Sequence, residues 1–336
     1  MIMAYKIKAY QIVTAFLLSI FVACNMGLAQ EPSNANPKTL HVLFIGNSYT
    51  ARHNLAQVVK AMSEAANAEL SFLPTQVIYG GQTLKAHWRL GTQHIINRHC
   101  VNREQVAATI AELKTASEED PTFKHASGGL TRMRSLLQEI ENGTLDRTKW
   151  DLVVLQSYRD DLQGAQSSYM RFAPKFAELA KAQDARVLLY ETTPSTQNQF
   201  PITQHQEPSA VLEKARQIAK LATQIDASVA PMSYVALQCQ TSNPQVTLRF
   251  ENDPHLNQTM AYLTACTIYA AIYDRSPEGV AIDSVTDIRF LNNDRDSGKD
   301  RDGKPIKKVF SKQEQAFLQT TAWRALQEFK KKFQPQ

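Results

Sequence analysis

This sequence has few long apolar runs and no large excess of positive or negative residues. Of its 336 residues 43% are hydrophobic and 21% charged, without the bias of collagen, coiled-coil or disordered chains. The apolar run from Ile12 to Ala23 is shorter than the ~20 residues that a membrane-spanning helix needs, which disfavours a permanent anchor. The net charge is only +5, and basic residues are dispersed apart from Lys330-Lys331-Lys332. This dispersal argues against a nucleic-acid-binding protein.

The N-terminus has the pattern of a secretory signal peptide spanning residues 1–29. Lys6 and Lys8 precede the apolar run, and Gly27-Leu28-Ala29 provides small residues for cleavage. We therefore expect an exported protein, periplasmic or extracellular. Cys24 follows a segment that loosely resembles a bacterial lipobox, so a lipoprotein held at the membrane through Cys24 is the alternative.

Cysteine is also scarce, because only three of the 4 cysteines remain after the leader. They are Cys100, Cys239 and Cys266. An odd number in an oxidising compartment allows at most one internal disulfide. Cys100 with Cys239 is a guess for that pair, and the sequence leaves the pairing open.

Short apolar segments alternate with helical patterns along the mature chain. The strand-like segments are Thr39–Ile45, Phe72–Tyr79, Asp151–Gln156 and Arg186–Tyr190. Such alternation predicts an α/β fold with a mostly parallel sheet covered on both faces, which we expect to form one domain over residues 38–333. The section from about 84 to 149 is too long for a structureless connection and predicts a helical insertion, with helices near 103–117 and 130–140.

Ser48 stands between a strand and a helix, in Gly46-Asn47-Ser48. A serine at that turn lies at the carboxyl edge of the sheet, where ligands bind in open α/β folds. Its plainer role is that of a helix N-cap. His255 favours the catalytic role, because a serine hydroxyl needs a neighbouring base and histidine titrates near neutral pH. It lies in a polar loop ahead of an apolar helix expected over 258–273.

These two segments together resemble the blocks of the SGNH (GDSL-like) hydrolases. Gly46-Asn47-Ser48 is similar to the first block of that family, and His255 with the helix after it is similar to the last. A second block, with a glycine N–H that donates to an oxyanion, resembles Gly80-Gly81, where Gly81 is favoured. The resemblance implies a three-layer α/β/α flavodoxin-like sandwich and an acyl-transfer mechanism without metal or organic cofactor.

Two positions depart from the family pattern. Where the third block has an oxyanion-binding asparagine, this chain has Gln156, and either Gln156 or Arg159 is expected to complete an oxyanion hole formed with the N–H groups of Ser48 and Gly81. Three residues before His255 the family has aspartate, whereas this chain has Asn252 and then Asp253. We expect Asp253 to orient His255, with a Ser-His dyad as the alternative.

The resemblance implies a secreted serine esterase that acts on a small-molecule or glycan ester, with O-acetyl groups of carbohydrate as the favoured substrate. Trp88, Tyr158 and Arg159 are candidates for contacting a sugar. The alternative from another class is a catalytically weakened glycan-binding or envelope protein.

Two groups of residues could indicate a metal instead. His87, His94 and His99 lack the i, i+4 spacing of a helical metal site, which favours structural or surface roles. The run that contains Asp294, Asp296, Asp300 and Asp302 departs from the spacing of a calcium loop, so a solvated charged loop is favoured.

Overall fold

The computed structural model describes residues 38–158, 162, 164, 166–192, 194–204, 206–288 and 298–334. The predicted signal peptide and Cys24 lie outside these ranges, and so does Arg159. Within the described ranges, no helix combines the length and apolar character that crossing a bilayer requires.

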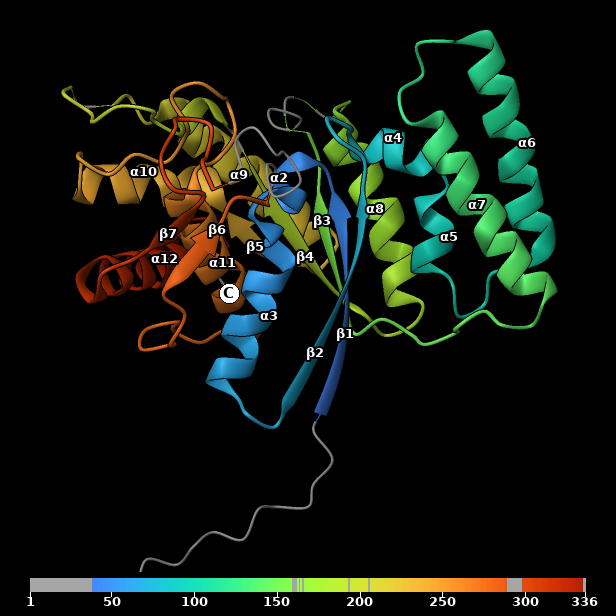
Figure 1. The fold of residues 1–336 in the computed structure, drawn as a ribbon, viewed down its shortest axis with the longest axis horizontal. Helices are drawn as coiled ribbons and strands as arrows, with labels where there is room; N and C mark the ends of the chain where they lie inside the picture. The colour runs from blue at the N-terminus through green and yellow to red at the C-terminus, as the bar shows by residue number, and fades with distance from the viewer. Residues whose placement is uncertain are drawn as a thin grey trace, which may run out of the picture. The chain divides into compact units, whose positions relative to one another are not determined.

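A five-stranded parallel sheet forms the centre of the fold, with the strand order β2-β1-β3-β4-β5 (Figure 1). The strands are β1 (Lys38–Gly46), β2 (Leu70–Ile78), β3 (Leu152–Gln156), β4 (Arg186–Glu191) and β5 (Ser228–Pro231). Every residue of β3 is buried, as expected for a strand covered on both faces. The predicted α/β/α sandwich with a parallel sheet is confirmed, and β5 is a strand that the sequence analysis missed.

The strand order places a switch point between β1 and β3. The chain leaves β1 for β2 on one side and returns to β3 on the other, while both neighbours pair in parallel with β1. Connections that depart in opposite directions leave a crevice at the carboxyl ends of the strands, where ligands bind in such folds. The loop after β1 carries Ser48, so the topology places it at this crevice.

Helices cover the two faces of the sheet (Figure 1). On one face α3 (Leu55–Ala66) packs against α11 (Gln258–Tyr273), and α12 (Lys312–Phe333) packs on α11. On the other face α8 (Ser168–Lys181) packs against β3 and β4. The bounds of α11 are those that the apolar pattern predicts. Two further helices flank β5, namely α9 (Ser209–Gln224) and α10 (Met232–Ser242).

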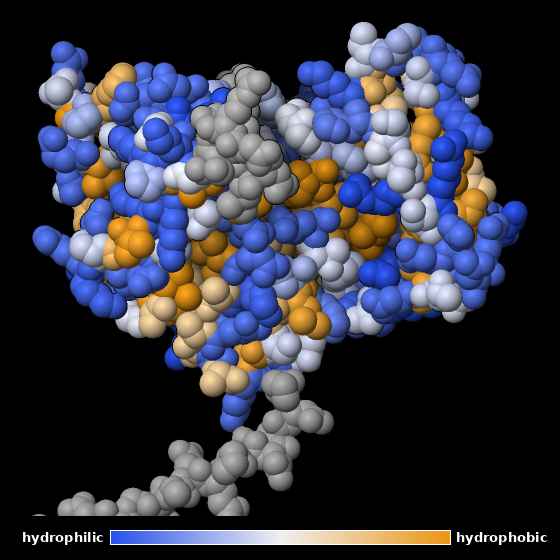
Figure 2. Space-filling view, viewed as in Figure 1, coloured by the Kyte–Doolittle hydropathy of each residue, from blue (hydrophilic) through white to orange (hydrophobic). Residues whose placement is uncertain are grey.

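The predicted helical insertion lies between β2 and β3. It contains α4 (Leu84–Arg89), α5 (Thr92–Ile96), α6 (Arg103–Glu119) and α7 (Ala126–Glu141). The first two pack against α8, and α6 and α7 pack against each other as a hairpin at the right of Figure 1. Hydrophilic residues predominate on the face of this hairpin in view in Figure 2, because the apolar sides of the two helices face one another.

The stretch after α11 contains a small second sheet. Strands β6 (Ser284–Thr286) and β7 (Lys307–Val309) form an antiparallel pair. Short helical turns complete the fold: α2 (Ser48–Ala51), η1 (Arg52–Asn54) and η2 (Pro194–Thr196).

The tentative disulfide between Cys100 and Cys239 is wrong in this structure. Cys100 is an exposed free thiol, whereas Cys239 and Cys266 are buried free thiols. Burial raises the pKa of Cys239 to about 12, which leaves it a protonated, unreactive core residue.

Candidate active site

Ser48 is the first residue of α2, directly after the turn that ends β1. Asn47 caps this short helix by accepting a hydrogen bond from the N–H of Tyr49. The Asn47 carboxamide donates to the carbonyl groups of Gln82 (3.1 Å) and Ser157 (3.3 Å). Asn47 therefore ties the loops after β1, β2 and β3 together beneath Ser48.

The turn needs glycine at position 46 because other side chains approach its backbone closely. A Cβ atom there would lie 2.3 Å from Thr50 Oγ1 and 2.5 Å from Gln156 Oε1. Both neighbours are buried and hydrogen-bonded to each other, so neither has room to move aside. Crowding of this kind excludes any larger residue ahead of Ser48.

We expect Gly46→Ala to lower the free energy of unfolding by about 1–3 kcal/mol, the usual range for an overpacked core. Urea unfolding measures the change. Gly128→Ala is the matched control, since a Cβ there would lie 4.0 Å from its nearest neighbour, Tyr79 Cε1, within helix α7. That control should be neutral or slightly stabilising. Equal stability of the Gly46→Ala protein and the unmodified one would contradict the crowding.

The structure brings Ser48, His255 and Asp253 together in one hydrogen-bonded chain. His255 Nε2 lies 2.9 Å from Ser48 Oγ, and the other ring nitrogen, Nδ1, is hydrogen-bonded to Asp253 Oδ1. The backbone N–H of His255 also donates to Asp253 Oδ1 (3.0 Å). An imidazole that donates from Nδ1 to a carboxylate has the Nε2 lone pair free to accept the Ser48 proton. Asn252, by contrast, is exposed, and its side chain is directed to Asp302 rather than to the His255 ring.

Tyr49 supports the loop that carries His255. Its hydroxyl donates to the carbonyl of Pro254 (2.8 Å), and its ring centroid lies 5.4 Å from that of His255. The residue next to the candidate nucleophile thus holds the candidate base at the required distance.

The carboxylate of Asp253 is buried and faces two arginines. Arg52 Nη1 and Arg301 Nε each lie 3.2 Å from its Oδ2 atom. Burial by itself raises the pKa of Asp253, but the hydrogen bonds from His255 and the charge of Arg52 outweigh burial and hold that pKa well below its usual range. The carboxylate is therefore ionised at neutral and mildly acidic pH.

Arg52 and Asp287 are site residues that the sequence analysis missed. Arg52 is buried, donates to both carboxylate oxygens of Asp287 (3.3 and 2.8 Å) and lies 4.5 Å above the ring of Phe250. Asp287 follows β6 and is completely buried. No local signal links two residues that stand so far apart in the sequence.

Gly81 and Ser48 line the same cavity. The φ of Gly81, +69°, lies in the left-handed region that favours glycine. The loop is held by His125 of the insertion, which donates from Nε2 to the carbonyl of Gly80 (2.9 Å). The N–H of Tyr79 is bonded to the carbonyl of Gly46 (3.1 Å). This arrangement fixes the Gly81 backbone beside Ser48.

Gln156 does not occupy the oxyanion position expected of it. Its side chain is completely buried: Oε1 accepts from the N–H of Asn47 (2.8 Å) and from Thr50 Oγ1 (3.0 Å), and Nε2 donates to the carbonyl of Ser157. Its amide is thus directed into the protein and holds the turn before Ser48. The alternative donor, Arg159, lies outside the described residues.

A cavity of about 560 Å³ opens beside Ser48 and His255. Its lining includes Tyr49, Gly81, Tyr158, Pro254 and Ile288. Trp88, which the sequence analysis places near a bound sugar, instead packs against the rings of Phe172 and Phe176 of α8, 6.3 and 5.2 Å away between centroids. Of the three residues proposed to contact a sugar, the structure places Tyr158 in the cavity.

Two of the three candidate histidines of the insertion, His87 and His94, have hydrogen-bond partners within the protein. His87 Nε2 lies 2.9 Å from the carbonyl of Gly46, and its Nδ1 lies 3.1 Å from Thr92 Oγ1. His94 Nε2 lies 2.8 Å from Thr109 Oγ1. Among the residues that the structure places, no group of three or more His, Cys, Asp or Glu side chains could hold a metal ion.

Three buried histidines make stability depend on pH. Burial lowers the pKa of His87 from 6.5 to about 3, that of His94 to about 4 and that of His53 to about 4. Below pH 6.5 these histidines therefore bind protons in the unfolded chain but stay neutral in the folded chain. Their contribution to stability is fully present above pH 6.5 and is lost as the pH falls.

We expect the free energy of unfolding to decrease between pH 6.5 and pH 4.5, with a slope that approaches about 4 kcal/mol per pH unit if all three histidines contribute. Urea unfolding at several pH values measures the slope. His94→Gln should reduce this slope by about one third, because one of the three titrating groups is removed. An unfolding free energy that stays constant down to pH 5 would contradict the burial of neutral histidines.

Two aspartates of the loop before β7 accept hydrogen bonds from backbone N–H groups of the protein. Asp302 accepts from the backbone N–H groups of Glu251 (3.0 Å) and Asn252 (3.1 Å), and Asp300 accepts from those of Asp302 (3.0 Å) and Lys304 (2.9 Å). Asp300 and Asp302 are partly exposed, as a charged surface loop requires, and these bonds also attach the loop to the protein. Asp294 and Asp296 lie outside the described residues.

An α/β/α fold with a parallel central sheet thus presents a hydrogen-bonded Ser-His-Asp group at its switch point. No family model matches the sequence, and the search of curated proteins finds no match. Among solved structures, a candidate SGNH hydrolase from Slackia heliotrinireducens is 17% identical, with 70% of this chain and 100% of that chain covered and a TM-score of 0.41. A DUF4886 family protein from Bacteroides uniformis is 14% identical, with 86% and 95% covered and a TM-score of 0.46. A gut microbial diltiazem-metabolizing enzyme is 11% identical, with 71% and 47% covered and a TM-score of 0.34. These similarities concern the fold alone.

Proposed function

We propose that this protein is a serine esterase in which Ser48 is the nucleophile and His255 the general base. One observation carries the proposal: Ser48 Oγ and His255 Nε2 lie 2.9 Å apart beside an open cavity, while Nδ1 of the same ring is bonded to a buried carboxylate. A serine hydroxyl becomes a nucleophile near neutral pH when a base in this geometry accepts its proton.

The reaction follows from this arrangement. His255 Nε2 takes the Ser48 proton as Ser48 Oγ attacks the ester carbonyl, and the Asp253 carboxylate stabilises the imidazolium that forms. The backbone N–H groups of Ser48 and Gly81 are the donors proposed for the oxyanion. His255 then protonates the departing alcohol, and a water molecule activated in the same way releases the acid from Ser48.

The favoured substrate is an O-acetyl ester of a carbohydrate, handled outside the cytoplasm. Tyr158 lines the cavity and is partly exposed, so its ring provides an apolar face on which a sugar can stack. The cavity of about 560 Å³ has room for a sugar with a small acyl group. The proposed export rests on the leader pattern with Lys6, Lys8 and the apolar run to Ala23.

A binding protein with weakened catalysis is the second candidate, and Gln156 is the observation that favours it. In the resembled family an asparagine side chain donates to the oxyanion. The Gln156 amide is hydrogen-bonded inside the protein and does not provide this donor. Loss of one oxyanion donor typically lowers turnover ~10²–10³-fold.

Covalent labelling separates the two candidates. We expect a fluorophosphonate probe to react with the folded protein and mass spectrometry to locate the adduct on Ser48. A panel of p-nitrophenyl acetate, longer p-nitrophenyl esters and acetylated xylan then defines the acyl group and the alcohol. Absence of labelling in folded protein, combined with binding to glycans, would favour the second candidate.

A further inference from the structure

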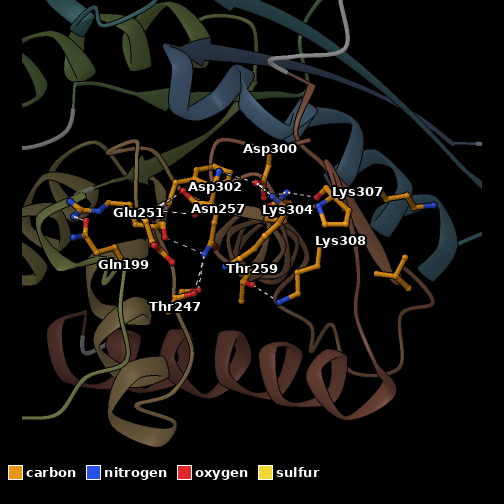
Figure 3. A pocket seen from close by; sticks show the side chains of 15 residues that line it. Gln199, Thr247, Glu251, Asn257, Thr259, Asp300, Asp302, Lys304, Lys307 and Lys308 are labelled. Carbon is orange, nitrogen blue, oxygen red and sulfur yellow. Dashed lines mark hydrogen bonds between the residues drawn. The ribbon is translucent and has the colours of Figure 1, made fainter. Parts of the chain in front are cut away.

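The loop 298–306 lies against the loop that carries Asp253 and His255. Figure 3 shows Asp302 of this loop beside Glu251, with Asp300 and Lys304 along the same wall of a second cavity. Asp302 receives hydrogen bonds from two consecutive backbone N–H groups ahead of Asp253. Asp300 also accepts from Gln258 Nε2 (3.2 Å), at the start of α11. The loop 298–306 is thereby anchored to both ends of the His255 segment.

Arg301 stands between these two anchoring aspartates and reaches Asp253. Its Nε atom lies 3.2 Å from Asp253 Oδ2, the carboxylate oxygen that faces away from the His255 ring. The Arg301 side chain is 30% exposed, whereas that of Asp253 is 5% exposed. A partly exposed cation therefore touches a buried carboxylate of the candidate catalytic group.

The charges around Asp253 make Arg301 influential. The other guanidinium on this carboxylate, Arg52, is bonded at the same time to Asp287, 2.8 Å from Nη2 to Oδ2. Arg52, Asp287 and Asp253 together carry one net negative charge, and Arg301 cancels it. Among the described residues, the charged and titratable groups that face the Asp253–His255 pair from its neighbouring elements are Tyr49, Arg52, His53, Asp287, Arg301 and Asp302.

We propose that Arg301 is a positioning residue that acts through Asp253, holding the carboxylate against His255 and limiting how readily the Asp253–His255 pair takes up a proton. This inference rests on the proposed function and deepens it. Removing a positive charge beside the pair makes protonation easier, so the base is lost at a higher pH. A purely structural role for Arg301 would instead lower activity by the same factor at every pH.

The test is the pH profile of kcat/KM for p-nitrophenyl acetate with Arg301→Gln, Arg301→Lys and Lys304→Gln. We expect Arg301→Gln to move the acid limb upward by about half a pH unit, the size appropriate to a partly exposed ion pair. On that limb kcat/KM then falls about threefold, and the profiles converge at high pH. Arg301→Lys keeps the positive charge, so its acid limb should lie close to that of the unmodified protein.

Lys304→Gln is the matched control, because Lys304 is an exposed cation of the same loop. Its profile should coincide with that of the unmodified protein. A profile for Arg301→Gln that coincides with this control, or that is lowered in parallel at all pH values, overturns the inference.

A second measurement separates failure of this inference from failure of the proposed function. If the unmodified protein neither hydrolyses esters nor reacts with a fluorophosphonate, the proposed function fails. The pH dependence of the His255 ring resonances, followed by NMR, still tests Arg301 in that case. Identical titration curves for the unmodified protein and Arg301→Gln overturn the coupling without reference to activity.

Discussion

Replacing Ser48 by alanine should lower kcat for p-nitrophenyl acetate by at least about 10³-fold, because the nucleophile that forms the acyl-enzyme is removed. His255→Ala should have a similar effect, since Ser48 Oγ then has no base 2.9 Å away. The double variant should be no slower than either single one, because residues that act as one unit are not additive. Hydrolysis under saturating substrate, with circular dichroism to verify folding, measures these effects.

A serine of helix α6 provides the control. Ser117 is partly exposed and its hydroxyl is bonded to the carbonyl of Lys114 in the same helix, so Ser117→Ala removes a serine hydroxyl that contacts neither Ser48 nor His255. It should retain full activity. If folded Ser48→Ala hydrolyses esters as fast as the unmodified protein, Ser48 is not the nucleophile and the proposed site is wrong.

Asp253→Asn is the second change for which we expect a large effect, a decrease in kcat of about 10³–10⁴-fold. Asparagine has the same shape, but its neutral carboxamide cannot stabilise the imidazolium. It can also present an N–H group to Nδ1, which leaves the proton on Nε2 and prevents His255 from accepting one from Ser48. The pKa of Asp253 lies well below its usual range in the folded chain, so the charge that this substitution removes is present throughout the assay range.

The neighbouring residue offers a control for Asp253→Asn. Asn252→Ala alters the position at which the resembled family has its aspartate, but the Asn252 side chain is exposed and contacts Asp302 at 3.4 Å rather than the histidine ring. We expect it to change kcat less than about threefold, as for an exposed side chain away from the chemistry. A large loss with Asn252→Ala and none with Asp253→Asn would reverse the assignment of the third member.

Much of the sheet could be predicted because its strands have a local signal. The segments of β1, β3 and β4 are largely buried, so each reads as a nearly continuous apolar run. Strand β2 lies at the edge of the sheet and contains exposed positions, and its signal is weaker. Strand β5 was missed because only four residues, Ser228–Pro231, form it, and α10 begins at the next residue. Such a segment is too short for a periodic pattern.

The candidate site was predicted in part. The positions of Ser48 and His255 follow from a strand end and a helix start, both local features. The prediction that Gln156 binds the oxyanion was wrong for a tertiary reason. Gly46 has no side chain, and the Gln156 amide occupies the space that this leaves. There it accepts hydrogen bonds from the N–H of Asn47 and the hydroxyl of Thr50. Neither the space nor the partners appear in the residues around position 156.

The sequence by itself determined the parallel α/β architecture, the insertion and the two segments that meet at the switch point. Each of these depends on patterns of apolar residues and turns within a short stretch of the chain. Only the tertiary structure decided which groups surround the Asp253 carboxylate. Arg52, Asp287 and Arg301 come from separate parts of the chain, and their charges act through space at about 3 Å rather than along the sequence. The electrostatic environment of the proposed base therefore belongs to the folded chain alone.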